Sequence, residues 1–328
     1  MTVKLLIHSM LVVSLCVAGI VAWQPAHAQP YPAKPIRLII PYPPGGGVDA
    51  IMRPFAQFLS ARLGQQIIID NRGGAGGSIA MEATARAAPD GYTIVAAITA
   101  QLAINPALYK SLPYDPVKDF APITRFADGA YILVVHPSLP VKSVKEFVEL
   151  ARKRPNEITY ASAGNGSGGH LAGALLSSMT GIKILHVPYK GGGPGQVALL
   201  SGEVQANFQV WASSRGLIQN GRIRALGVTT ATRRKASPDI PTFAEAGVPG
   251  YESGLWYALL ATAGTPRAII DRLNRETIAV LNNPEYIKRL AEQGIEPVGS
   301  TPEELTQYIR RELDKWAKVV KDTGARID

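Results

Sequence analysis

The sequence predicts an α/β fold of two similar lobes, each a mainly parallel sheet flanked by helices. Three observations predict it: short β-rich runs alternate with helical patterns, glycine-rich loops follow several of the strands, and the same order of elements returns about 120 residues later. Strand–helix–strand units of this kind build parallel sheets with helices on both faces.

The composition fits such a fold. The chain has 328 residues, of which 46% are hydrophobic and 18% are charged, which is enough apolar material for sizeable cores in about two domains. Its 32 glycines and 25 prolines follow no collagen period, so they mark turns. These values exclude a disordered polymer and a fibrous protein.

Residues 1–28 have the pattern of a secretory signal peptide. Lys4 supplies the positive charge, residues 5–21 are almost entirely apolar, and Ala-His-Ala at the end is a cleavage signal. We expect cleavage after Ala28, which removes Cys16, the single cysteine, and excludes disulfides from the mature chain. An exported protein of this size without disulfides fits a bacterial periplasm. An uncleaved membrane anchor is the alternative.

The charge of the chain favours a small anionic ligand. The formal net charge is +9, and removal of Lys4 with the signal peptide leaves +8. The basic residues form only short clusters, at residues 152–154 and 233–235, and no aromatic side chains interleave with them. A nucleic-acid partner is therefore not expected, whereas a basic exported protein suits an anion.

The first strand–helix–strand unit begins with a strand at residues 36–40, followed by a proline- and glycine-rich loop at residues 43–47. A helical pattern then runs to Gly64, because glycine is the expected residue just past a helix. The second strand covers residues 66–70 and is closed by another glycine-rich loop. Pro54 lies inside the helical pattern, where it should bend or delay the helix.

The second unit repeats this order. It has a strand at residues 158–161, a glycine loop at residues 164–169 and a helix at residues 170–180. A strand at residues 182–187 follows, and then a loop at residues 190–193. Each half therefore carries glycine loops directly after its strands.

Three further helices have clear start signals. Ser143 with Glu146, and Thr301 with Glu304, form capping boxes. Thr265 precedes a proline that begins another helix. The apolar stripes of these helices are assigned to the core.

The glycine loops are the candidate binding elements. In open parallel sheets, ligands bind beyond the carboxyl ends of the strands, and each loop there exposes N–H groups at a helix N-terminus, which favours an anion. Two such helix N-termini, one from each lobe, could hold a carboxylate-bearing molecule, and the protein would need few charged side chains to do so. Asp49 would cap the first helix or reach the ligand. Thr99 follows a strand at residues 92–97, so it also lies at a carboxyl end.

Aromatic and histidine side chains near these loops could pack or bind. Tyr42 and Tyr189 lie beside loops, and Trp256, near an expected crossover between lobes, could wall the cleft. His170 lies in the first turn of a helix and either bridges loops or contacts a ligand. The three histidines of the mature chain lack H-x-x-x-H spacing, so no metal site is expected.

One alternative is a nucleotide-dependent enzyme. Gly164, Gly166 and Gly169 match the dinucleotide fingerprint and follow a strand. The acidic residue expected about 20 residues later is missing, since no Asp or Glu lies between residues 157 and 203. Lys190 could serve a 2′-phosphate, but nicotinamide cofactors are not expected in an exported protein.

A second alternative is an exported hydrolase that uses Ser167. The sequence around it differs from the G-x-S-x-G nucleophile elbow by Asn165 in place of the first glycine. His186 could supply a base and Asp239 an acid, but no acid lies between Ser167 and His186, so the hydrolase order fails. We expect Ser167 to make a loop hydrogen bond, and no catalytic residue is predicted.

Several motifs together resemble one family. They are Tyr-Pro-Pro-Gly-Gly-Gly-Val-Asp at residues 42–49, Asp-Asn-Arg-Gly-Gly-Ala-Gly-Gly at 70–77, Pro-Asp-Gly-Tyr at 89–92, Asn-Pro-Ala-Leu-Tyr at 105–109, Leu-Pro-Tyr-Asp-Pro at 112–116, Val-Pro-Tyr-Lys-Gly at 187–191 and Pro-Thr-Phe-Ala-Glu-Ala-Gly at 241–247. In this order they are similar to the tripartite tricarboxylate transporter solute-binding proteins, also called the Bug family. The match covers essentially the whole mature chain.

The resemblance implies a two-lobe periplasmic binding protein, a type II-like clamshell, with lobe 1 at residues 29–128 plus 254–328 and lobe 2 at residues 129–253. It implies capture of a small carboxylate by a monomer, without enzyme activity or a cofactor, and delivery to the membrane permease subunits of a tripartite tricarboxylate transporter. A sensing role, in which the liganded receptor docks on a membrane signalling protein, is a further alternative.

The resemblance also implies that backbone groups and ordered waters of two glycine loops hold the carboxylate. With the strand-end residues added, the expected ligand-binding set is Tyr42, Pro44, Gly45, Gly46, Asp49, Thr99, Ala100, Ser162, Gly164, Gly166, Ser167, His170, Tyr189 and Lys190. Many members of that family have an acid at the positions of Ala198 and Gln209. Their absence here favours a ligand without an amino group.

Overall fold

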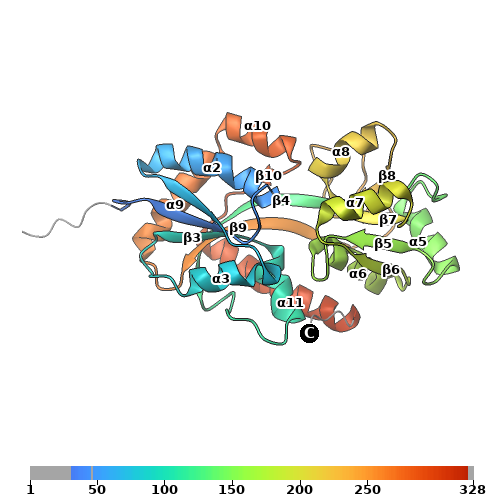
Figure 1. Ribbon diagram of the computed structural model, residues 1–328, viewed down its shortest axis with the longest axis horizontal. Coiled ribbons are helices and arrows are strands. Elements are labelled where there is room, and N and C mark those ends of the chain that lie inside the picture. The colour runs from blue at the N-terminus through green and yellow to red at the C-terminus, as the bar shows by residue number, and fades with distance from the viewer. Residues whose placement is uncertain (1–30, 46, 324–328) are drawn as a thin grey trace, which may run out of the picture. The chain divides into compact units, whose positions relative to one another are not determined.

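The computed structural model describes residues 31–45 and 47–323, so the expected signal peptide lies outside the described residues. Contacts divide the chain into residues 1–33 and residues 34–328, and the fold is that of the second unit (Figure 1). No helix in the described ranges is long and apolar enough to cross a membrane.

The strands and helices alternate as the sequence predicts. The strands are β1 (Ile36–Ile40), β2 (Ile67–Asn71), β3 (Thr93–Ile98), β4 (Phe120–Val135), β5 (Thr159–Ser162), β6 (Leu185–Pro188), β7 (Ala206–Val210), β8 (Arg224–Val228), β9 (Gly254–Thr262) and β10 (Glu296–Pro297). The helices are α2 (Gly47–Leu63), α3 (Ser78–Ala85), α4 (Asn105–Leu108), α5 (Val144–Lys153), α6 (Gly168–Thr180), α7 (Gly192–Ser201), α8 (Trp211–Gln219), α9 (Arg267–Leu281), α10 (Pro284–Glu292) and α11 (Pro302–Thr323). A 3-10 turn, η1 (Ala75–Gly77), and a π-helical turn, η2 (Ala100–Ile104), complete them.

The strands form a mixed sheet in the order β2-β1-β3-β9-β4-β7-β5-β6, with β10 and β8 also paired to β4. The groups β2-β1-β3 and β6-β5-β7 are parallel, as expected for two repeated units. The strands β9 and β4 lie between these groups and pair antiparallel. The parallel core of each half is therefore confirmed, and the antiparallel strands are added where the chain passes from one half to the other.

The strand β4 belongs to both halves of the sheet. Its residues 120–130 pair with β9, whereas residues 131–135 pair with β7. It changes partners between Ala130 and Tyr131 within one continuous strand of 16 residues. Figure 1 shows β4 and β9 side by side between the two groups of parallel strands.

The two capping boxes are confirmed, whereas α9 begins at Arg267, with Pro266 as its N-cap residue instead of its first residue. In α5, the Ser143 hydroxyl accepts from the Glu146 N–H at 3.2 Å. At the start of α11, Thr301 and Glu304 accept from each other's N–H, at 3.2 and 2.9 Å. These bonds need only residues three positions apart, so the sequence alone defines them.

Two element starts differ from the predictions by two residues or more, and Pro54 has a smaller effect than expected. Helix α6 begins two residues earlier, at Gly168, because Ser167 caps it, and β6 begins at Leu185 rather than at residue 182. Helix α2 continues through Pro54 without a break. The Ala50 carbonyl loses its partner there, but Ala50 is exposed, so water can hydrate the carbonyl.

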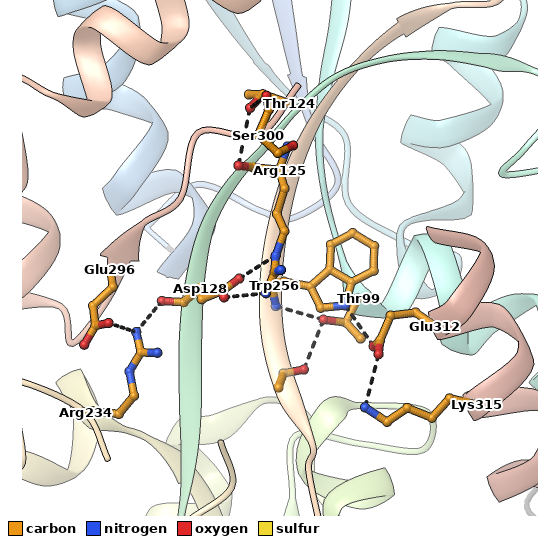
Figure 2. Close-up of polar contacts among 11 residues, drawn as sticks. Thr99, Thr124, Arg125, Asp128, Arg234, Trp256, Glu296, Ser300, Glu312 and Lys315 are labelled. Carbon is orange, nitrogen blue, oxygen red and sulfur yellow. Dashed lines mark hydrogen bonds and ion pairs between the residues drawn. The ribbon is translucent and has the colours of Figure 1, made fainter. Parts of the chain in front are cut away.

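A buried carboxylate joins two tryptophans in the core beside β9. The indoles of Trp256 and Trp316 both donate to Glu312 Oε2 at 3.1 Å. Lys315 pairs with the other oxygen of Glu312 at 3.1 Å, and Figure 2 shows Glu312 between Trp256 and Lys315. Glu312 is 6% exposed and Trp256 is 1% exposed. The Trp256 indole therefore packs in the core, where it connects β9 to α11, rather than forming a wall of a cleft.

Polar contacts also surround β4 where it nears its change of partner. Arg125 forms a two-bond ion pair with Asp128, and its guanidinium stacks 3.8 Å from the centre of the Tyr308 ring. Arg234, from the segment between β8 and β9, donates to the Asp128 carbonyl at 2.9 Å and pairs with Glu296 of β10 at 3.4 Å (Figure 2). These contacts join β4 to α11, to β10 and to the segment between β8 and β9.

We predict that Glu312→Ala lowers the free energy of unfolding by about 2 kcal/mol, because two buried indole N–H groups lose their acceptor. Glu312→Gln is the matched control, since its amide oxygen still accepts. Urea denaturation of both variants measures the difference. Equal stability of the two variants would show that the indole hydrogen bonds contribute little.

Candidate ligand-binding site

The first glycine loop is held by Asp49, the third residue of α2. Its Oδ2 accepts from the Gly45 N–H at 2.9 Å and from Arg53 Nε at 2.8 Å, and its Oδ1 accepts from Asn71 at 3.0 Å. Burial alone would raise the pKa of Asp49, but these hydrogen bonds outweigh burial and lower it. Asp49 is 3% exposed, and its carboxylate already has protein donors on both oxygens, so it shapes the loop from behind.

The outer side of this loop is open. Pro44 and Gly45 are exposed, and Gly46 lies outside the described residues. Gly45 has φ +82, a conformation that favours glycine, and nothing lies within 4 Å of the position that a Cβ would take. The loop therefore presents main-chain groups to open space, as the sequence predicts.

Tyr42 connects this loop to β3. Its hydroxyl accepts from Gln101 at 2.9 Å, and Gln101 also donates to the Gly76 carbonyl at 2.8 Å. Thr99, 3% exposed, accepts from the Trp256 N–H at 3.0 Å and so joins the end of β3 to β9. Ala100, also buried, is the first residue of η2. Thr99 and Ala100 are therefore buried residues that support the end of β3.

The second glycine loop is organised by two serines. The Ser162 hydroxyl accepts from the Gly164 N–H at 3.1 Å, and Ser167 donates to the Gly164 carbonyl at 2.7 Å. Ser167 also accepts from the His170 N–H at 3.4 Å as the cap of α6. Gly164 has φ +125 and Gly166 has φ +75, so both need glycine. The prediction that Ser167 makes a loop hydrogen bond is confirmed.

Two stacked histidines lie behind the second loop. The rings of His170 and His186 are 4.0 Å apart and nearly parallel, at 17°. His170 Nδ1 accepts from the Gly166 N–H at 3.1 Å, and His186 Nε2 lies 2.6 Å from the Ser162 hydroxyl. Burial lowers the pKa of His170 to about 4, and burial together with His170 lowers the pKa of His186 to about 3. Both rings are therefore neutral at physiological pH, and His170 bridges loop groups.

Tyr189 and Lys190 follow β6. The Tyr189 hydroxyl donates to Glu203 at 2.7 Å, so it points toward the start of β7. Lys190 is exposed. The next residue, Gly191, donates its N–H to the Ala163 carbonyl at 3.3 Å, which places the start of α7 beside the second glycine loop.

Three phenols, Tyr42, Tyr131 and Tyr257, lie within electrostatic range of one another. An added Cβ on Gly168, the first residue of α6, would lie 2.2 Å from the Tyr131 hydroxyl oxygen, so Tyr131 reaches the second loop. Burial raises the pKa of Tyr131, and the nearby Tyr42 phenol of the first loop raises it further. Burial raises the pKa of Tyr257 on β9, and the Tyr131 and Tyr42 phenols raise this pKa further. Burial also raises the pKa of Tyr42, to about 12.

These phenols remain protonated and can donate. Among residues 31–45 and 47–323, neither Tyr131 nor Tyr257 donates its hydroxyl to a protein acceptor. The sequence analysis missed both, because each reads as an ordinary apolar strand residue. Their position next to Tyr42 is a product of strand pairing: Tyr257 pairs with Ile98 of β3, and Tyr131 pairs with Val210 of β7.

A small cavity lies beside Tyr257. It has a volume of about 60 Å³, room for a few water molecules, and Gly47, Trp211 and Leu255 also line it. It therefore separates the first turn of α2 from the first turn of α8. None of the residues in the predicted ligand-binding set lines it, although Gly47 directly follows the first glycine loop.

The predicted site residues thus fall into two groups at strand ends. One contains Tyr42, Pro44, Gly45, Asp49, Thr99 and Ala100, and the other contains Ser162, Gly164, Gly166, Ser167, His170, Tyr189 and Lys190. Across residues 31–45 and 47–323 no group of His, Cys, Asp or Glu could hold a metal ion.

Residues 51–325 match the family model of the tripartite tricarboxylate transporter family receptor. The chain belongs to this family. The resemblance carried by the motifs is therefore confirmed.

Relatives of this receptor family match the chain over most of their length. Protein BugT of Bordetella pertussis is 38% identical over 95% of this chain and 96% of its own. A solved structure described as a periplasmic transporter is 42% identical and covers 91% of this chain and 100% of its own, with a TM-score of 0.81. R. palustris Rpa4515, solved with adipate, is 38% identical and covers 90% of this chain and 100% of its own, with a TM-score of 0.82. The predicted α/β periplasmic-binding-protein fold is confirmed.

We predict that acid destabilises this receptor through the histidine stack. Between about pH 6.5 and about pH 4, the unfolded chain binds protons that the folded protein does not, so the free energy of unfolding falls as the pH falls. Each histidine contributes up to about 1.4 kcal/mol per pH unit.

Thermal melts of the wild type, His170→Gln and His186→Gln at a series of pH values test this. Each variant should show a smaller loss of melting temperature on acidification than the wild type. Identical pH dependence in all three proteins would exclude the stack as the cause.

Proposed function

We propose that this protein is an exported solute receptor that captures a small carboxylate between its two glycine loops. It would then deliver the carboxylate to the membrane permease subunits of a tripartite tricarboxylate-type transporter. Membership in the receptor family and the adipate in the related R. palustris structure support this proposal.

The observation that carries the proposal is the set of uncharged donors between the loops. The Tyr131 and Tyr257 hydroxyls have protons to donate, and the loops add N–H groups at the starts of α2 and α6. Asp49, whose carboxylate bonds to the first loop, is occupied by Arg53 and the Gly45 N–H. Hydrogen-bond donors without a competing free acid suit an anion rather than a cation or an amine.

We propose two lobes with the boundaries expected from the family resemblance, which lie close to the partner change of β4 between Ala130 and Tyr131. Lobe 1 comprises residues 29–128 plus 254–328, and lobe 2 comprises residues 129–253. The first glycine loop then belongs to lobe 1 and the second to lobe 2, while β4 and β9 join them. A carboxylate that bonds to both loops stabilises the closed arrangement by its differential contacts, which is the mechanism of capture.

The same proposal covers location and activity. The signal-peptide pattern of residues 1–28 and the periplasmic description of a relative support a periplasmic protein. We infer a monomer without a cofactor and without enzyme activity. Ser167 is engaged with Gly164, and His186 lies against Ser162 instead, so the hydrolase alternative lacks its dyad. A sensing role requires the same binding event, and transport in a deletion strain separates it from uptake.

The first test is a thermal-shift and calorimetric screen of the mature protein with mono-, di- and tricarboxylates, including adipate. At least one carboxylate should stabilise the protein by about 2.7 kcal/mol at 100 times its Kd. The matching neutral amide is the control and should give no shift. Absence of stabilisation by any carboxylate in the panel contradicts the proposal.

A second test removes the phenol donors one at a time. Tyr131→Phe and Tyr257→Phe should each raise the Kd for adipate about tenfold, since a hydrogen bond to a charged group contributes about 1.5 kcal/mol or more. Tyr251→Phe is the control: its hydroxyl donates to the Ala172 carbonyl at 2.8 Å in the core, so it should change stability but not affinity. Unchanged adipate affinity in both site variants would remove the phenols from the site.

A further inference from the structure

Gln209 carries a buried amide with no protein partner. Its side chain is 6% exposed, and neither its Nε2 nor its Oε1 has a hydrogen bond within the described residues. An unsatisfied buried polar group costs about 1–3 kcal/mol, so such groups in native proteins call for a ligand, an ordered water or a functional role. Gln209 is not explained by the loops described above.

Gln209 lies at the carboxyl end of β7, the same edge of the sheet as the second glycine loop. The strands β5, β6 and β7 are parallel, so the ends of all three lie together. Val210 and Trp211, the next two residues, line the cavity beside Tyr257. Gln209 therefore directly precedes the residues that line this cavity, while its own side chain points to the opposite face of β7 from that of Val210.

The N-terminus of α7 lies over the same face of β7. An added Cβ on Gly195 of α7 would lie 3.4 Å from Asn207 Nδ2, and Asn207 shares a face with Gln209 because side chains alternate along a strand. Asn207 pairs with Ala161, and Gly191 bonds to Ala163, two residues further along. By this register the start of α7 is level with Gln209.

This helix start is suited to a second anionic group. No side chain caps α7 at Gly191, and an added Cβ at Gly191, Gly192 or Gly193 would meet nothing within 4 Å. Helix N-termini carry a partial positive charge and free N–H groups. No Asp or Glu occurs between residues 157 and 203, so the chain supplies no acid of its own from this stretch.

We propose that Gln209, together with the first turn of α7, recognises the second carboxylate of a dicarboxylate ligand. This inference rests on the proposed function: the first carboxylate is bound between the glycine loops, and Gln209 donates an N–H to the other end. A monocarboxylate would place a methyl group beside Gln209 and leave its amide unpaired. Gln209 is thus a specificity-determining residue that selects dicarboxylates over monocarboxylates.

The test compares matched ligands by isothermal titration calorimetry at about pH 7.5, where carboxylates are ionised. The probes are the α,ω-dicarboxylates from succinate to pimelate and the monocarboxylate with the same number of carbons as the tightest of them. The proteins are the mature wild type, Gln209→Met, Gln209→Glu and the control Gln219→Glu, an exposed position on α8 of the same lobe.

The wild type should bind the dicarboxylate at least about tenfold more tightly than its monocarboxylate partner. Gln209→Met should lower the affinity for the dicarboxylate about tenfold and that for the monocarboxylate less than about twofold. Gln209→Glu should lower the dicarboxylate affinity further, because its carboxylate repels that of the ligand. Gln219→Glu should match the wild type. The unliganded Gln209→Met protein should melt no lower than the wild type, since it removes an orphan amide.

Three outcomes overturn the inference. The wild type could bind both ligand classes equally, the Gln209 variants could weaken both classes to the same extent, or Gln209→Met could unfold several degrees earlier, which would show a structural role. If the wild type binds no carboxylate at all, the proposed function itself fails. Carboxylate binding without discrimination at Gln209 contradicts only this inference.

Discussion

The antiparallel pairing of β4 with β9, and then of β4 with β7, is the constraint on which the rest of the structure depends. A single strand carries main-chain hydrogen bonds from the first parallel group to the second, and its register fixes which side chains meet. This register also sets which strand positions carry Tyr131 and Tyr257, the two phenols within electrostatic range of Tyr42. Arg234 donates to the Asp128 carbonyl of β4, and Glu312 of α11 accepts from Trp256 of β9, so both strands are also bonded to elements beside the sheet.

The candidate site relies on neutral donors in place of buried cations. A lysine or arginine buried between two halves would be costly whenever the site is empty, because the charge would lack a partner. Phenols with raised pKa and main-chain N–H groups at helix starts cost much less to leave unpaired. A receptor that must both bind and release an anion therefore remains stable in its empty form.

Both glycine loops are shaped by side chains that lie behind them. Asp49 and Asn71 support the first loop, while Ser162, His170 and His186 support the second. A loop that is already ordered does not lose conformational freedom when the ligand binds, so more of the contact energy appears as affinity. The same arrangement explains why Ser167 and His186 do not form a catalytic pair: each is used to hold the loop.

The sequence by itself determined the features that depend on neighbouring residues. The capping boxes, the glycine loops after β1 and β5 and the role of Ser167 all need hydrogen bonds between residues a few positions apart, and local patterns report such bonds. Tertiary structure alone decided what distant residues do. The meeting of Tyr42, Tyr131 and Tyr257, the stack of His170 on His186 and the unpaired amide of Gln209 arise from strand order and register, which no local pattern encodes. Trp256 likewise became a core residue because α11, from the far end of the chain, covers it.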